Sequence, residues 1–252
     1  MSNGLWHTSG KPLTVIEGHN GPVRGVAFNR DSNLLATSGH DGTIRLWNID
    51  DKPLVKLKLV GSSKVAFSKV AFSPNGLIGA RGNYSTAYLW DTSGKQLVEL
   101  KASQYSFGSL IFSPDGKQVA VNSMDDKAIL LYSISGKQLA LLEGLNLAFS
   151  PDGKFLATGR KDGTVQFWDS SGRKLALFQA HQGPVRIVVF SPDSKLLASG
   201  GDDSTVRLWD TSGKQLVELK GHKQQSIIST VAFSPDSQLI SSCAELITQY
   251  LY

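Results

Sequence analysis

The stretch LWDTSGKQLVELK at Leu89–Lys101 decides the fold, because it recurs without a single change at Leu208–Lys220. A close variant, LWHTSGKPL, stands at Leu5–Leu13. Sequence identity at a fixed spacing predicts an architecture in which one structural unit is copied along the chain. The chain is therefore expected to be a repeat protein.

A second phrase, FSPDG or a near variant of it, gives the length of the repeat. It begins at six phenylalanines: Phe28, Phe72, Phe112, Phe149, Phe190 and Phe233. A tryptophan or tyrosine follows each of them by 18 to 20 positions, and the distance from Trp6 to Tyr252 is 246 positions, or six periods of 41. Four short strands of a propeller blade occupy a period of this length.

Short apolar segments alternate with turn residues inside each period, as VRGVAF, NLLATS and TIRLWNI do in the first copy. Asp-Gly and Ser-Gly-Lys between such segments favour tight turns, and no segment has a sustained helical period. We therefore predict an all-β, six-bladed β-propeller with four antiparallel strands, a to d, in each blade. The chain 1–252 is expected to be a single domain with approximate repeats 18–60, 61–101, 102–142, 143–179, 180–220 and 221–252 plus 5–17.

The two ends of the chain are in phase with the repeat, which predicts how the ring closes. Leu13–Ile16 has the pattern of an outer strand d, and the last segment, Ile247–Tyr252, has that of a strand c. Pairing of the two would complete the sixth blade and leave no open edge at the seam. The alternative is that the chain forms part of a seven-bladed or longer propeller.

Composition restricts the classes of protein that the chain can belong to. It has 25 Gly, 40% hydrophobic and 19% charged residues, which is typical of a turn-rich globular protein, and its single cysteine, Cys243, excludes an internal disulfide. The net charge is +5, but the basic residues are interspersed with acidic ones along the chain, which disfavours nucleic-acid binding. No long apolar run or secretory signal is visible, so we expect a cytoplasmic protein without a membrane segment, and we favour a monomer.

Two units carry a family resemblance that covers nearly the whole chain. The first contains GHNGPVRGVAF and LLATSGHDGTIRLWN, and the fifth contains AHQGPVRIVVF and LLASGGDDSTVRLWD. These motifs resemble those of the WD-repeat family, and TSGKQL and SPDGK are similar to the phrases of long bacterial, above all cyanobacterial, WD-repeat chains. The resemblance implies a protein-protein interaction scaffold.

The resemblance also implies a hydrogen-bonded chain of a histidine before strand a, a serine or threonine on b, an aspartate in the b–c turn and a tryptophan on c. The matching residues are His19, Thr37, Asp41 and Trp47 in the first unit, and His181, Ser199, Asp203 and Trp209 in the fifth. A Ser-His-Asp trio could also indicate a hydrolase, but these trios recur at the repeat spacing and have no G-x-S-x-G turn. We therefore predict a structural network.

The other four units depart from this pattern. Ala80 replaces the serine in the second unit, and Asn122 stands at the serine place in the third. The fourth unit loses the histidine, and the sixth keeps His222 and Ser242 but has Leu246 at the aspartate place. We expect these blades to be less firmly tied together than the first and fifth.

Function is expected on the face formed by the d–a and b–c loops, where residues differ from unit to unit. The candidates for partner binding are Arg24, His40, Arg81, Tyr84, Tyr105, Arg160, Lys161, Arg186 and Asp202. The expected partners are proteins or peptides; the alternative is a small ligand or carbohydrate in the central mouth. Neither a metal-ligand set, nor a cofactor motif, nor an activated nucleophile is recognisable, so we predict no metal, no cofactor and no enzymatic activity.

Overall fold

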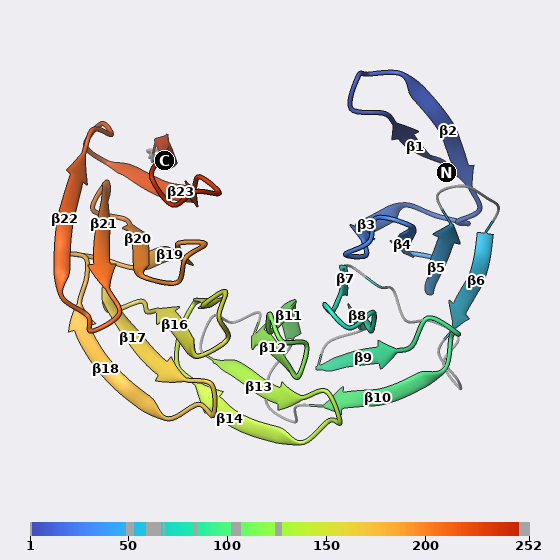
Figure 1. Cartoon of the computed structure of the whole chain (residues 1–252), viewed down its shortest axis with the longest axis horizontal. Coiled ribbons are helices and arrows are strands. Elements are labelled where there is room, and N and C mark those ends of the chain that lie inside the picture. The colour runs from blue at the N-terminus through green and yellow to red at the C-terminus, as the bar shows by residue number, and fades with distance from the viewer. Residues whose placement is uncertain are drawn as a thin grey trace, which may run out of the picture. The chain divides into compact units, whose positions relative to one another are not determined.

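The regular structure of the chain consists of antiparallel strands. The computed structural model describes residues 2–48, 53–58, 67, 69–82, 85–101, 107–123 and 128–246, and the strands in these ranges are β1 to β24, with no helix among them. The chain divides into two compact units, one formed by 1–112 with 134–136 and the other by 113–133 with 137–252. Figure 1 shows the strands in chain order.

The first unit contains two four-stranded sheets, which we call blades 1 and 2. Blade 1 has the strand order β3-β4-β5-β6, with bounds Val23–Phe28, Leu34–Gly39, Thr43–Asn48 and Pro53–Lys58. Blade 2 consists of β7 to β10, with bounds Val70–Phe72, Ile78–Arg81, Thr86–Trp90 and Gln96–Lys101. The unit also holds a hairpin of β1 (Ser2–Trp6) with β2 (Pro12–Glu17), and strand β11 (Phe107–Phe112).

The second unit begins inside the third repeat. Its strands β12, β13 and β14 run antiparallel to one another, with bounds Gln118–Ser123, Ile129–Ser133 and Gln138–Leu142. Blade 4 consists of β15 to β18, with bounds Asn146–Phe149, Phe155–Gly159, Thr164–Asp169 and Lys174–Gln179. Blade 5 consists of β19 to β22, with bounds Val185–Phe190, Leu196–Gly201, Thr205–Asp210 and Gln215–Lys220. A hairpin follows, formed by β23 (Ser226–Phe233) and β24 (Ile240–Leu246).

The repeated phrase D-T-S-G-K folds as the turn between strands c and d. In blade 5 the Asp210 carboxylate accepts hydrogen bonds from the backbone N–H groups of Ser212 and Lys214, at 2.9 and 3.0 Å. Gly213 has a φ of +88°, a region that residues with a Cβ rarely adopt. The aspartate and the glycine of the phrase are therefore required by the turn itself.

Consecutive blades of the second unit pack closely enough to restrict their turn residues. A Cβ on Gly172, in the c–d turn of blade 4, would lie 2.3 Å from the Cβ of Ala140 in strand β14. On the a–b turns, the hydroxyl of Ser194 in blade 5 accepts a hydrogen bond from the backbone N–H of Asp152 in blade 4, at 3.0 Å. Backbone and side chain thus join neighbouring blades at both turns.

The hydrophobic core lies between successive sheets within each unit and is built mainly from strands a, b and c, with some residues of strand d such as Leu142. In the first unit a buried cluster joins Ile44 and Leu46 of blade 1 to Ile78 and Trp90 of blade 2. In the second unit Phe167 of blade 4 packs in one cluster with Trp209 and other residues of blade 5. Burying such a side chain contributes roughly 1.5 to 3 kcal/mol, so each blade depends on its neighbour for most of its core.

The sequence prediction of an all-β chain with four-stranded antiparallel repeats is confirmed. The closure of a six-bladed ring, the single domain and the repeat boundaries stay predictions. Of the two segments predicted to close the ring, Leu13–Ile16 lies within β2, which pairs with β1, and Ile247–Tyr252 lies outside the described residues.

Candidate functional site

A chain of buried hydrogen bonds ties four segments of blade 5 together. The indole N–H of Trp209 donates to the hydroxyl of Ser199 at 2.9 Å. The Ser199 oxygen lies 2.8 Å from Nε2 of His181, and Nδ1 of that ring lies 2.8 Å from the Asp203 carboxylate. One neutral tautomer satisfies every group, with Nδ1–H donating to Asp203 and Nε2 accepting the serine proton. The four residues named from the sequence therefore lie together.

Blade 1 contains the same arrangement. The indole of Trp47 donates to Thr37 Oγ1 at 2.9 Å, and His19 lies 2.8 Å from that hydroxyl and 3.0 Å from the Asp41 carboxylate. Partial burial raises the pKa of Asp41, but hydrogen bonds from Asn20, Thr43 and His19 outweigh it and lower the pKa to about 2. The carboxylate is therefore charged at neutral pH and is fully occupied within the frame.

The histidine ring lies directly on the backbone at the end of strand b. A Cβ on Gly201 would be 2.6 Å from Cγ of His181, and one on Gly39 would be 2.3 Å from Nδ1 of His19. Because the atoms in the way belong to buried, hydrogen-bonded rings, no larger residue fits without displacing the network. Gly39 in blade 1 and Gly201 in blade 5 are thus part of the site.

Two further members of this site, Arg45 and Arg207, are not among the residues predicted from the sequence. The Arg207 guanidinium lies 3.5 Å from Asp203 and 2.9 Å from Glu218, and it donates to the backbone carbonyl of Ala180. Arg45 lies 3.7 Å from Asp41. Arginine stands two positions before the tryptophan only in the two units with a complete set, and that coincidence in the sequence could have identified both residues.

The other blades keep only parts of the network, each in its own way. In blade 4, Thr158 accepts from the Trp168 indole at 3.1 Å and donates to the backbone carbonyl of Glu143 at 2.8 Å, so the main chain occupies the place of the missing histidine. In the last repeat, His222, which precedes β23, lies 2.7 Å from Ser242 in β24. In blade 2, the buried indole N–H of Trp90 has no hydrogen-bond partner among the described residues.

The prediction that Asn122 occupies the serine place of the third repeat is wrong. Thr37 pairs with Arg45, two positions before the tryptophan of blade 1. The residue that pairs two positions before Tyr132 is Val121, and Asn122 points to the other face of the strand. The b–c loop is one residue longer here, and an apolar side chain therefore fills the serine position.

The buried trios are not arranged for catalysis on a substrate from solution. His181 and Ser199 are both 0% exposed, and the serine hydroxyl is already engaged by the ring and by the indole. Among the described residues there is no group of three or more His, Cys, Asp and Glu side chains placed to hold a metal ion. The described chain likewise contains no helix long and apolar enough to cross a membrane.

Residues predicted to bind a partner lie beside this network, and several of them form ion pairs. Arg186 binds Asp202 through two parallel hydrogen bonds, Nε to Oδ1 at 2.7 Å and Nη2 to Oδ2 at 2.8 Å. Arg160 contacts Glu143 at 2.8 Å and Asp162 at 3.2 Å. Two nominated arginines are thus neutralised by carboxylates of the same chain.

The remaining candidates fall into three groups. Arg24, His40 and Lys161 are exposed. Arg81 is half-buried at the end of β8, where burial lowers the pKa of its guanidinium. Tyr84 and Tyr105 lie outside the described residues.

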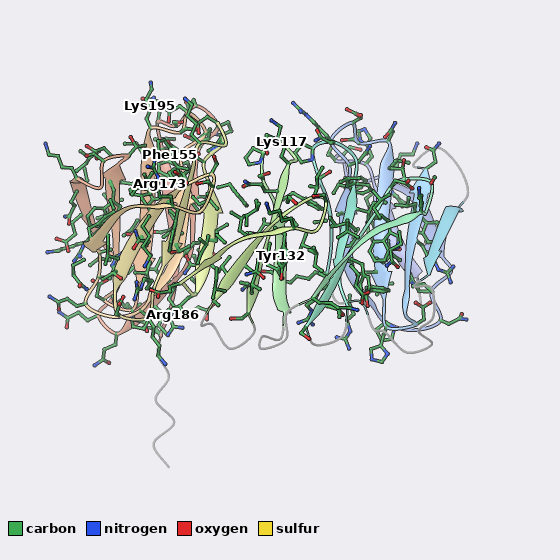
Figure 2. The ribbon with its side chains drawn as sticks, turned by 90° about the horizontal axis from the view of Figure 1, so that it is seen from below. Lys117, Tyr132, Phe155, Arg173, Arg186 and Lys195 are labelled. Atoms are coloured by element: carbon green, nitrogen blue, oxygen red, sulfur yellow. The ribbon has the colours of Figure 1, made fainter. Side chains whose placement is uncertain are left out.

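Arg186 and the repeated lysine turns lie at opposite ends of the strands of the second unit. Figure 2 shows Arg186 at one end, and Lys117 and Lys195 at the other. At that other end Lys195 lies 3.6 Å from Asp193 and Lys117 lies 3.9 Å from Asp115, so the lysines stand beside carboxylates of their own turns. The end that holds Arg186 is therefore distinct from the end formed by the repeated lysine turns.

Comparison with known proteins identifies the repeats. The profile of the WD domain, G-beta repeat, matches residues 10–48, 144–169, 172–210 and 213–245, which is more than half of the chain. The small ribosomal subunit protein RACK1y of Oryza sativa is 30% identical over 171 residues, covering 67% of this chain and 41% of that protein. An uncharacterized WD repeat-containing protein of Synechocystis is 28% identical over 127 residues, 50% of this chain and 37% of the relative.

A third relative has a name that mentions RNA. It is the U3 small nucleolar RNA-associated protein 18 homolog of Arabidopsis thaliana, 30% identical over 160 residues, or 60% of this chain and 29% of that protein. The chain spans less than half the length of each of these three relatives.

The unpaired indole of Trp90 leads to a test by substitution. Ala80 pairs with Tyr88, so it has the place that Thr37 has in blade 1. We expect Ala80→Ser to supply the missing acceptor and to raise the free energy of unfolding by about 1 kcal/mol, measured in a denaturant titration. The control is Ala36→Ser, which puts a hydroxyl into the apolar cluster beside Ile44 and should lower stability. Equal losses in both variants would show that the indole gains nothing from the new hydroxyl.

The buried histidine of blade 5 should make stability depend on pH. Burial lowers the pKa of His181 below its usual value of about 6.5, and it outweighs the opposing hydrogen bond and charge of Asp203. The folded state thus prefers the neutral ring, so its stabilising contribution is complete above about pH 6.5 and is lost as the pH falls below that value. The pKa of Asp203 is also lowered: burial raises it, but bonds from Thr205, His181 and Gln182 outweigh burial, and the carboxylate stays charged in this window.

We therefore expect the free energy of unfolding to fall between about pH 6.5 and 5, by at most about 1.4 kcal/mol per pH unit for this group. Tryptophan fluorescence in denaturant at several pH values measures the slope. The variant His181→Asn cannot take up a proton and should have a smaller slope, although it is less stable throughout. An unchanged slope in that variant would contradict the assignment.

Proposed function

Because the chain belongs to the WD40 repeat family, we propose that it is a scaffold that binds a protein partner on the face formed by the d–a and b–c loops. WD40 proteins generally act as protein-interaction scaffolds, and the fold is in general non-enzymatic. The cyanobacterial resemblance seen in the sequence is supported by the relative from Synechocystis. A cytoplasmic location and a monomeric state are part of the proposal.

One observation carries this proposal: the residues that recur are used in the frame, while the exposed residues beside them differ. Asp41 and Asp203 have the same hydrogen bonds in blades 1 and 5. The residue before each of them differs, being His40 in blade 1 and Asp202 in blade 5. A rigid frame with variable residues at the ends of its strands is the arrangement that supports selective binding.

Two alternatives receive less support. Binding of a small ligand or carbohydrate in the central mouth depended on Tyr84 and Tyr105, which lie outside the described residues. Nucleic-acid binding is suggested by one relative whose name mentions RNA. However, Arg160 and Arg186 are paired with carboxylates of this chain. The described contacts therefore favour binding of a protein partner.

The choice of face is tested by charge reversal at the two ends of the strands. The chain is immobilised and exposed to an extract of its source organism, and the double variant Arg24→Glu with Arg186→Glu is compared with Lys117→Glu with Lys195→Glu. We expect the first pair to weaken capture of a stoichiometric partner about tenfold or more, because like charges would then meet at the interface. The second pair, at the other end of the strands, should leave capture unchanged. If only the second pair weakens capture, the partner binds at the end of the strands that holds Lys117 and Lys195.

We also propose that the chain closes as a ring of six blades, with the hairpin β1–β2 supplying strands c and d of the sixth. In this proposal β1 takes the place of strand c that was predicted for Ile247–Tyr252, because β2 pairs with β1. The hairpin carries LWHTSGKPL, the counterpart of the c–d phrase of blades 2 and 5. The Trp6 side chain is 62% exposed, whereas Trp47 and Trp209 are 4% and 3% exposed. Ser242 has its histidine, and within the described residues no indole donates to it. Trp6 would complete this site.

Strand register gives a direct test of closure. Cys243 follows Ile240 by three positions, as Ser38 follows Leu35, and the residue paired with Ser38 is three before the tryptophan. By that register, position 3 would lie opposite Cys243. We expect Asn3→Cys to form a disulfide with Cys243 within one chain under mild oxidation, read by mass spectrometry of peptides. Thr8→Cys, in the turn of the same hairpin, is the control and should not cross-link. A link between two chains, or none, would contradict this closure.

A further inference from the structure

Blades 1 and 5 place an arginine at the same irregular point of strand a. The strand register shifts between Val23 and Gly25 in β3, and between Val185 and Ile187 in β19. The residues within these β-bulges are Arg24 and Arg186. A bulge leaves its extra residue outside the ladder and redirects its side chain, and bulges are frequent beside binding sites.

The neighbours of the two arginines also have equivalent backbone positions. The N–H of His40 donates to the carbonyl of Pro22 at 2.9 Å, and the N–H of Asp202 donates to that of Pro184 at 3.1 Å. His40 in blade 1 and Asp202 in blade 5 therefore occupy the same position, which we call the partner position. It lies 16 residues after the arginine and is held by the same main-chain hydrogen bond. Only the side chain at that position differs.

In blade 5 the arginine is satisfied by its own chain. The Asp202 carboxylate accepts two hydrogen bonds from the Arg186 guanidinium, at 2.7 and 2.8 Å. Such a bidentate pair fixes the orientation of both groups and neutralises both charges. Blade 5 thus shows which chemical group an arginine on this bulge binds, and in what geometry.

Blade 1 has the same arginine without the carboxylate. His40 cannot supply a negative charge, and the neighbouring Asp41 is already bonded to His19, Asn20 and Thr43. Arg24 is exposed, and among the described residues no ion pair or hydrogen bond of its guanidinium is found.

A second exposed cation, Lys69, lies directly before the adjoining strand β7 of the same unit. A Cβ on Gly25, next to Arg24, would lie 3.1 Å from the Cα of Lys69, the residue that precedes strand β7. The Lys69 side chain is exposed, and in the described part of the first unit it forms no ion pair. Arg24 and Lys69 are thus two exposed cations whose backbone segments lie close together in the first unit.

We infer that Arg24, with Lys69 beside it, is a docking point for a carboxylate side chain in an acidic segment of the partner protein. This inference rests on the proposed scaffold function and specifies the chemistry of the partner. The partner's carboxylate takes the place, relative to Arg24, that the Asp202 carboxylate takes relative to Arg186. His40 leaves that place without a competing acid.

An acidic peptide fits these observations better than a nucleic acid. The group that the chain itself places on the equivalent arginine is a carboxylate, and the two hydrogen bonds match its planar geometry. Nucleic-acid binding depends on many phosphate contacts along a basic track, whereas the arginines of the second unit are paired with acids. The positive charge is therefore local to blade 1.

The experiment measures binding of a fluorescent peptide of alternating glutamate and glycine by anisotropy at low ionic strength. The variants Arg24→Ala and His40→Asp should each weaken binding about fivefold or more, the second because it recreates the internal pair of blade 5. Arg173→Ala is the matched control and should leave the affinity unchanged, because this arginine lies in the c–d turn of blade 4 and is paired with Asp169 at 2.9 Å. Thermal unfolding of each variant verifies that it is folded.

Each outcome decides the inference. Weaker binding in Arg24→Ala and His40→Asp, with unchanged binding in Arg173→Ala, supports it. Equal losses in Arg24→Ala and Arg173→Ala, or no loss in His40→Asp, would overturn it. If Arg24→Ala and His40→Asp weaken binding of an oligothymidylate but not of the peptide, the site binds phosphates and the inference is wrong.

Failure of the scaffold function has a different signature. If the charge-reversal pair at Arg24 and Arg186 releases a captured partner but the peptide does not respond to Arg24→Ala, the scaffold function stands and the acidic-segment inference falls. If no partner is captured while the peptide still depends on Arg24, the scaffold function fails and the carboxylate site remains.

Discussion

The buried imidazole of blades 1 and 5 imposes the strictest constraint in this structure. A polar ring without access to water must have both nitrogens bonded, because each unsatisfied buried polar group costs about 1 to 3 kcal/mol. The Ser199 hydroxyl and the Asp203 carboxylate satisfy His181, and Trp209 satisfies the remaining capacity of the serine. One side chain thereby fixes the approach to strand a, strand b, the b–c turn and strand c. The glycine under the ring follows from the same constraint, since no Cβ fits there.

Blades that lack the imidazole show what the constraint requires. In blade 4 the shortened approach to strand a brings a backbone carbonyl, that of Glu143, to the hydroxyl of Thr158, and the hydrogen bond is retained without a histidine. In blade 2 the hydroxyl itself is absent, and the indole of Trp90 is left without an acceptor in the described structure. Loss of the ring can therefore be compensated by the main chain. Loss of the hydroxyl, at the centre of the network, is not.

Much of the fold could be predicted from the sequence because strands and turns depend on local signals. The spacing of phenylalanine and tryptophan and the Ser-Gly-Lys turns indicate where each strand begins and ends, and the structure has strands there. The eight network residues of units 1 and 5 could be named because their spacing is identical. Counting back from Tyr132 to Asn122 failed, since one extra loop residue shifts the register and turns a side chain to the opposite face. Spacing alone does not reveal where a loop has lengthened.

Contacts that depend on the path of the backbone were not predictable in the same way. Nothing in the residue types indicates that the carbonyl of Glu143 would replace a histidine, because every residue has a carbonyl. The role of Arg207 beside Asp203 and Glu218 has a weak signal, namely its presence only in complete units. The Arg186–Asp202 pair was hidden for a different reason: both residues were predicted to lie on the binding face, and a spacing of 16 positions does not indicate that they bind each other.

That pairing explains how a repeat protein can vary its binding face without disturbing its frame. The bulge that presents the arginine and the main-chain bond that holds the neighbouring turn are the same in blades 1 and 5. A change between aspartate and histidine at the partner position leaves the buried network untouched, because the adjacent Asp41 or Asp203 supplies the frame. It nevertheless decides whether the arginine is neutralised within the chain or remains available to another molecule. Residues one position apart in the b–c turn thus have separate roles, one in the frame and one in recognition.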